Sequence, residues 1–152
     1  MKEFIQKLDE NVIGFFRRAE IPLARFAIFL VYFWFGFLKI VGFSPATPLV
    51  QSLFEKTLGF MPFSTFYICF AVFEVAIGVM FLIRDFERPA IIMLGLHMIT
   101  TAMPLVLLPN ITWQAFLVPT LEGQYIIKNI LIIALAVVVG SRIMPLSSSG
   151  SK

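Results

Sequence analysis

Charged residues are scarce in this chain of 152 residues. Asp, Glu, Lys and Arg make up 14% of the sequence, whereas 59% is hydrophobic and the mean hydropathy is +0.93. A soluble globular domain carries roughly 25% charged residues to cover its surface. The shortage of charge therefore excludes an ordinary soluble domain and indicates that most of the surface faces lipid.

Metal-ligating residues are also scarce, because the sequence contains a single cysteine, Cys69, and a single histidine, His97. One cysteine cannot form an intramolecular disulfide, a Cys-x-x-Cys redox pair or a cysteine-rich metal site. Together the two residues cannot ligate an iron–sulfur cluster or a bis-histidine haem. We expect no metal, haem or iron–sulfur cluster to be bound by this chain alone. A nucleic-acid partner is not expected either, because the basic residues do not gather on one basic, aromatic face.

Four long hydrophobic runs predict four transmembrane helices that form one bundle. Each run has about the 20 residues needed to cross a hydrocarbon core about 30 Å thick. Pro22 and Pro89 suit the first turn of a helix, whereas Pro104 predicts a kink inside the third span. The predicted spans are residues 23–43, 63–83, 89–108 and 124–142.

The remaining segments complete the predicted organisation of an all-α membrane protein. Residues 1–20 place bulky apolar side chains at helical spacing and predict an amphipathic interfacial helix along the membrane surface. Residues 21–143 would form the four-helix transmembrane domain. Residues 48–58 predict a short lid helix, and 109–123 an interfacial loop. The polar segment 144–152 is expected to be a disordered tail or an added linker.

The basic residues predict the orientation of the chain in the membrane. Nine of them lie in the segments on one side of the predicted spans, whereas the connectors on the other side contain only Lys56. An excess of Lys and Arg marks the cytoplasmic side of a membrane protein. We therefore expect both termini on the cytoplasmic side of the membrane.

Ionisable residues inside or at the ends of the spans are the candidate functional residues. A charge at the centre of a bilayer costs roughly 2.5–3.5 kcal/mol, so such side chains normally face protein or trapped water. Glu74 lies roughly 14 Å and His97 roughly 12 Å from the same predicted membrane face, which places them at one level. The candidate ligand-binding residues of this polar core are Lys39, Glu74, His97, Glu122, Tyr125 and Lys128.

Two interpretations of these residues remain open. In the first, Glu74 and its partners only satisfy one another and fix the helix register, His97 bonds to Thr100, Thr101 or a backbone carbonyl, and the lysines extend to the outer headgroups. In the second, Lys39 and Lys128 turn inward above Glu74. They would then form a polar pocket, open to the periplasmic side, for a quinone-like ligand or a small anion.

Short motifs recur in order along the four predicted spans. They are Arg25-Phe26 with Trp34-Phe35-Gly36-Phe37-Leu38-Lys39, Pro48-Leu49-Val50, Phe73-Glu74-Val75-Ala76-Ile77-Gly78, Thr101-Ala102-Met103-Pro104-Leu105-Val106, and Glu122-Gly123-Gln124-Tyr125-Ile126-Ile127-Lys128-Asn129. These motifs resemble those of the DoxX-like superfamily of membrane proteins, and within it the YkgB branch that includes reactive chlorine resistance protein C. The similarity covers roughly residues 25–140, without the long insert that this branch carries between its first two spans.

The resemblance implies a four-helix bundle of the bacterial inner membrane with a redox or oxidative-stress function. Some DoxX-like proteins are subunits of a quinone-linked oxidoreductase, which implies a quinone ligand and a redox partner subunit or a homo-oligomer. Other relatives act in assembly, which implies the alternative of a non-catalytic membrane scaffold or assembly chaperone. A small-solute or proton transporter that uses Glu74 and His97 is a further alternative. Whether the protein is an enzyme stays open.

Overall fold

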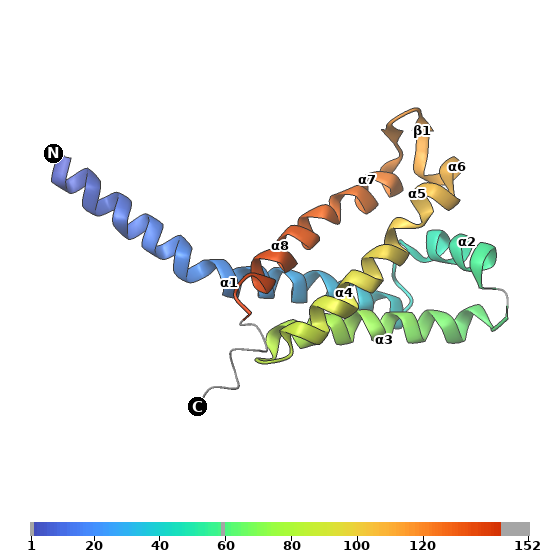
Figure 1. Cartoon of the computed structure of the whole chain (residues 1–152). Helices are drawn as coiled ribbons and strands as arrows, with labels where there is room; N and C mark the ends of the chain where they lie inside the picture. Colours follow the sequence, from blue (N-terminus) through green and yellow to red (C-terminus); the bar gives the residue numbers. More distant parts are fainter. Residues whose placement is uncertain (1, 59, 144–152) are drawn as a thin grey trace.

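The computed structural model describes residues 2–58 and 60–143, which are mainly helical. Figure 1 shows the order of the elements along the chain. They are α1 (Lys2–Ile40), α2 (Thr47–Thr57), α3 (Phe63–Leu82), α4 (Glu87–Ala102), α5 (Pro104–Leu107), α6 (Pro109–Thr112), β1 (Trp113–Ala115), β2 (Val118–Pro119), α7 (Leu121–Lys128) and α8 (Ile130–Gly140). The tail predicted for residues 144–152 lies outside the described residues.

Four helical segments of the described chain are long and apolar enough to cross a membrane. They are α1, α3, α4 continued by α5, and α7 continued by α8. The prediction of a mainly helical protein with four helices able to cross a membrane is confirmed. The third span is interrupted at Met103, directly before Pro104, where the sequence predicts a kink: α4 ends at Ala102 and Pro104 begins α5.

The first span does not begin a new helix at Leu23, as the sequence predicted. Instead of separate helices before and after Pro22, α1 continues from Lys2 to Ile40 with Pro22 inside it. Its 39 residues correspond to a length of about 58 Å, nearly twice the thickness of a hydrocarbon core. Proline lacks the N–H that bonds to the preceding turn, which bends a helix without always ending it. Accordingly, Figure 1 shows the N-terminal part of α1 extending beyond the bundle at an angle to the rest of the helix.

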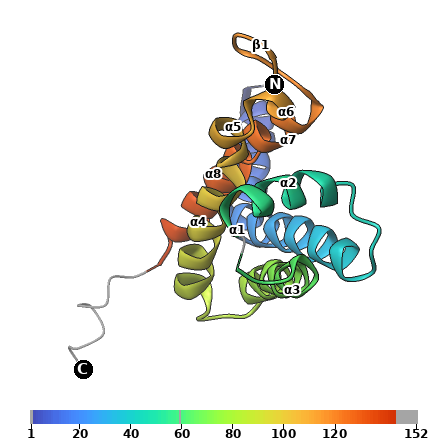
Figure 2. The ribbon, with the colours of Figure 1, turned by 90° about the vertical axis from the view of Figure 1, so that its right-hand side faces the viewer.

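The closest helix pair in the bundle is α1 and α3, which run side by side (Figures 1 and 2). Two glycines allow this approach. A Cβ atom added at Gly36 would lie 2.9 Å from the Ala71 carbonyl oxygen, and one added at Gly78 would lie 3.0 Å from the Phe33 backbone nitrogen. Small residues at such interfaces let transmembrane helices pack backbone against backbone.

The remaining spans, α4 and α8, complete the bundle. Helix α8 packs against α1 and α4, and α4 also packs against α3. The fully buried side chains of Ile28, Ile77 and Phe81 belong to the core that these helices share. Apolar residues on the outer surfaces of the spans are exposed in the isolated chain, as expected for helices that face lipid.

Ionic contacts tie the helices together at one end of the bundle. The Arg25 side chain donates to the carbonyl oxygens of Phe81 (2.6 Å) and Ile83 (2.9 Å) and pairs with Glu87 at 2.7 Å. It thereby caps the end of α3 and fixes the start of α4. Arg142 forms a further ion pair with Glu20. We call this end, comprising residues 20–25, 83–88 and 141–142, the arginine end.

At the opposite end, the connectors are more ordered than the sequence predicted. The expected short helix is confirmed as α2, and Lys56 near its end donates to the Leu107 carbonyl oxygen at 2.6 Å. The segment expected to be an irregular loop instead forms α6 and an antiparallel β1–β2 hairpin. Thr120 follows the hairpin and caps α7 by accepting a bond from the Gly123 amide at 3.1 Å.

Candidate functional site

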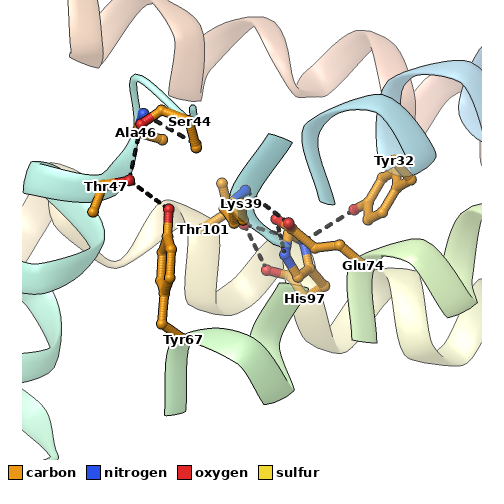
Figure 3. Close-up of polar contacts among 9 residues, drawn as sticks. All are labelled: Tyr32, Lys39, Ser44, Ala46, Thr47, Tyr67, Glu74, His97 and Thr101. Carbon is orange, nitrogen blue, oxygen red and sulfur yellow. Dashed lines mark hydrogen bonds and ion pairs between the residues drawn. The ribbon is translucent and has the colours of Figure 1, made fainter. Parts of the chain in front are cut away.

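Four buried polar side chains from three spans meet inside the bundle (Figure 3). Tyr32 and Lys39 come from α1, Glu74 from α3 and His97 from α4, and each is only 4–6% exposed. The Lys39 ammonium lies 2.7 Å from Oε2 of Glu74, whose Oε1 lies 3.1 Å from Nε2 of His97. The Tyr32 hydroxyl lies 3.0 Å from Nδ1 of His97. We call these four residues the polar cluster.

The spacing of residues along α1 explains how two of them reach the same site. Tyr32 and Lys39 are seven residues apart, or about two helical turns, so they share one face. Gly36 lies between them on that face and allows α3 to approach closely. Glu74 is positioned on α3 one turn before Gly78, the other glycine of this contact. The close α1–α3 packing therefore brings the Lys39 ammonium and the Glu74 carboxylate together.

Aromatic rings enclose the imidazole of His97. The Phe70 ring is stacked on it with a centroid distance of 5.1 Å, and the Tyr32 ring meets it edge-on at 5.2 Å. Phe73 lies further away at 6.2 Å. The Lys39 ammonium also lies over the Phe70 ring, 5.7 Å from its centroid, which favours the cation. The cluster is therefore polar at its centre and aromatic around its histidine.

The hydrogen bonds assign a tautomer to His97. A carboxylate only accepts hydrogen bonds, so the Nε2 atom facing Glu74 carries the proton. In a neutral imidazole Nδ1 is then an acceptor, to which the Tyr32 hydroxyl donates. The Thr101 hydroxyl lies 3.2 Å from the same Nδ1 and 2.9 Å from the His97 carbonyl oxygen. With Lys39 protonated and Glu74 ionised, a neutral imidazole gives the cluster no net charge.

Charge neutrality matters because these groups are withdrawn from water. Isolated buried charges are strongly unfavourable, whereas a pair with complete hydrogen bonding recovers much of the desolvation cost. Throughout the part of the chain that the structure describes, every fully buried side-chain nitrogen or oxygen has a hydrogen-bond partner. The polar cluster is thus a closed network whose members already bond to one another.

A second polar group lies at the start of α2, next to the polar cluster in Figure 3. The Thr47 hydroxyl lies 2.5 Å from the Tyr67 hydroxyl of α3 and donates to the Ser44 carbonyl oxygen at 2.8 Å. Ser44 is itself buried. These contacts attach α2 to α3 on the Lys39 side of the cluster. Sequence reasoning did not single them out, because hydroxyl residues in a connector carry no specific signal.

The structure brings together three of the six candidate residues predicted from the sequence. Lys39, Glu74 and His97 are in contact, and Glu74 and His97 lie at one level as their positions along the spans predicted. Glu122, Tyr125 and Lys128 are exposed on α7.

Of the two interpretations, the one in which both lysines turn inward does not hold for Lys128, which is exposed. Its ammonium lies over the Tyr125 ring, 5.4 Å from the centroid, and its side chain is exposed. A long lysine side chain near a helix end can extend its charge toward the headgroups without cost to the core. Glu122 lies in the first turn of α7, where a carboxylate favours the helix dipole.

Tyr32 is the member of the cluster that sequence reasoning missed. Among so many aromatic residues in the first span it resembles lipid-facing bulk. Its position two turns before Lys39 was the available signal, since both side chains had to point to the same side of the helix.

Among the residues that the structure describes, no group of three or more His, Cys, Asp or Glu side chains is arranged to hold a metal ion.

Comparison with known proteins returns no match, whether to a family model, to a curated protein or to a solved structure. The DoxX-like resemblance therefore stays a prediction.

Proposed function

We propose that this protein is a DoxX-like subunit of the bacterial inner membrane that binds a quinone-like molecule or a small anion at the polar cluster, in a redox or oxidative-stress function. One observation carries the proposal: the unbroken series of contacts Tyr32–His97–Glu74–Lys39 inside the membrane spans. Ionisable groups are costly at that depth and commonly mark ligand or proton sites.

The donors and rings of the cluster fit such a ligand. The Lys39 ammonium and the Tyr32 hydroxyl are donors suited to a carbonyl oxygen or an anion, and the Phe70 and Phe73 rings offer contacts for an apolar ring. His97 would serve as the proton carrier, because its two ring nitrogens face the Tyr32 hydroxyl and the Glu74 carboxylate. A ligand oxygen could bond to the Lys39 ammonium beside Glu74, because an ammonium has three N–H donors and Glu74 accepts one of them. At Tyr32 it would have to replace the bond from the hydroxyl to His97.

The test is to purify the protein in mild detergent and identify bound quinones by mass spectrometry of the extract. We expect quinone to accompany the wild type and to be lost in Glu74→Gln and Lys39→Met. Glu122→Gln and Lys128→Met remove the same groups at exposed positions and should retain it. Absence of both a bound quinone and any saturable binding of added quinone or small anions would refute the proposal.

A second candidate function is a non-catalytic scaffold or assembly chaperone for other membrane proteins. It is favoured by the completeness of the network, which ties α1, α3 and α4 together with no polar atom left over. In that case the Glu74→Gln variant would lose stability and partner recovery together, and no small molecule would travel with the wild type.

We further propose that both termini face the cytoplasm and that the exposed N-terminal part of α1 lies along the membrane surface as an amphipathic helix. Exposed apolar side chains on this part support the second point, including Phe4, Leu8 and Phe16. In a variant with Cys69 replaced by alanine, an impermeant maleimide should label Glu55→Cys from outside intact spheroplasts and Asp9→Cys only after lysis. The reverse pattern would show the opposite orientation.

A further inference from the structure

An apolar groove of about 670 Å³ runs between α4 and α8. None of the residues that line it belongs to the polar cluster. The volume of the groove lies within the usual range for ligand pockets, about 300–1,000 Å³. Small residues open it, and a Cβ atom added at Gly95 would meet nothing within 4 Å. Residues that line it include Gly95, Met98, Ala102, Ala136, Gly140 and Ser141.

The groove begins at the arginine end and continues into the span. Ile91 and Ser141 line it near the arginine end, and Ala102 and Ile133 line it toward the other side. The walls are almost entirely apolar between these limits. An occupant must therefore be apolar along its length and can carry charge only at the arginine end.

The arginine end supplies the complementary charge. Arg88 lies one turn before Ile91 on α4, and Arg142 directly follows Ser141. This end contains four arginines against three carboxylates, so its net charge is positive. The four arginines are Arg25, Arg84, Arg88 and Arg142, and the three carboxylates are Glu20, Asp85 and Glu87.

We propose that the α4–α8 groove binds one acyl chain of an anionic phospholipid, with its phosphate at the arginine end near Arg88. Basic sites between transmembrane helices at a membrane face are suited to anionic lipid headgroups. The small residues give the acyl chain close contact with both helices, and the headgroup provides selectivity. This site does not depend on what the polar cluster binds.

Native mass spectrometry tests the site with phosphatidylglycerol and phosphatidylcholine that have the same acyl chains. The wild type should retain one phosphatidylglycerol in preference to phosphatidylcholine. Gly95→Leu and, independently, Ala102→Leu fill the groove and should abolish retention of both lipids. Arg88→Gln should lower the preference about fivefold, the effect of one basic residue near a membrane surface. Arg18→Gln, which removes an exposed arginine elsewhere on α1, should leave it unchanged.

Circular dichroism and thermal unfolding establish that each variant is folded, and either groove-filling variant alone suffices for the test. Equal retention of the two lipids, or unchanged retention in the folded groove-filling variants, would overturn the proposal. A wild-type dimer in light scattering that becomes a monomer in Gly95→Leu would also overturn it, because a second copy of the chain would then occupy the groove.

Discussion

The imidazole of His97 lies 3.1 Å from the carboxylate of Glu74 in the interior of the bundle, which joins α4 to α3. Glu74 uses its other oxygen for Lys39 on α1. One carboxylate therefore links three spans, and both of its oxygens have partners. This arrangement makes Glu74 the residue on which the stability and the chemistry of the cluster depend most directly.

The ion pair between Lys39 and Glu74 should be far more costly to break than to replace. Lys39→Met leaves the Glu74 charge buried without its cation and should lower the free energy of unfolding by about 3–5 kcal/mol. The double variant Lys39→Met/Glu74→Met removes both charges and should recover a large part of that loss. Unfolding in mixed detergent micelles measures both.

Lys128→Met is the matched control for that comparison, since it removes an exposed ammonium from the same protein. We expect it to change the free energy of unfolding by less than about 1 kcal/mol. If Lys39→Met and Lys128→Met had equal effects, the Lys39–Glu74 pair would contribute nothing specific to the fold.

Tyr32 should determine the hydrogen bonding of the unprotonated Nδ1 of His97, whereas Glu74 determines where the ring proton lies. In the wild type, ¹⁵N NMR should show His97 with a protonated Nε2 and a hydrogen-bonded, unprotonated Nδ1. Tyr32→Phe removes the donor to Nδ1, so the Nδ1 resonance should shift toward that of a free acceptor, with the Thr101 hydroxyl as its remaining neighbour. The stability change should be small, about 1 kcal/mol.

Tyr125→Phe provides the comparison for Tyr32→Phe, because Tyr125 is exposed on α7 and distant in sequence from the cluster. It should leave both ring nitrogens of His97 unchanged. A wild-type spectrum with the proton on Nδ1 would contradict the assigned tautomer.

The depth of the polar residues along their spans could be predicted from the sequence. Whether each side chain points into the bundle or out of it could not be predicted in every case. Glu74 and His97 are counted from the same connector, and because each helical residue adds about 1.5 Å, similar counts give similar depths. Depth says nothing about rotation around the helix axis. Lys39 turns inward because Gly36 brings α3 close, whereas Lys128 has no such neighbour and lies outside.

The four spans were also predictable from residue counts, because an apolar run of about 20 residues is the length that a helix needs to cross the hydrocarbon core. The break expected at Pro22 was wrong because proline bends a helix when the turns on both sides still form. The β1–β2 hairpin escaped prediction because its strands, Trp113–Ala115 and Val118–Pro119, are too short to show an alternating pattern.

A side chain at Gly78 should force α1 and α3 apart. A Cβ atom there would lie 3.0 Å from the Phe33 nitrogen and 3.1 Å from the Phe29 carbonyl oxygen, and because both are backbone atoms the helices themselves would have to shift by a few tenths of an ångström. Gly78→Ala should therefore destabilise the protein by about 1–3 kcal/mol in the unfolding assay.

Gly95→Ala tests whether that loss comes from the contact or only from replacing a helical glycine. Nothing lies within 4 Å of a Cβ atom at Gly95, so this change should be neutral or stabilise by up to about 1 kcal/mol. A similar loss in both variants would mean that the close α1–α3 approach is not responsible.

Arg25 should stabilise the arginine end through the geometry of its guanidinium as well as its charge. It donates to two carbonyl oxygens at the end of α3 while pairing with Glu87. Arg25→Gln should lower the free energy of unfolding by about 2 kcal/mol, because hydrogen bonds from a charged donor are lost. Arg25→Lys should restore only part of this, since one ammonium cannot reach all three acceptors in a planar fork.

The control for Arg25 is Arg18→Gln, because Arg18 is exposed and bonds only to the Gly14 carbonyl oxygen of its own helix among the contacts that the described structure shows. We expect its effect on unfolding to stay below about 0.5 kcal/mol. Hydrogen exchange should also separate the two, with faster exchange at the start of α4 in Arg25→Gln alone. Full stability of the Arg25→Lys variant would show that charge suffices and that the two carbonyl bonds at the end of α3 contribute little.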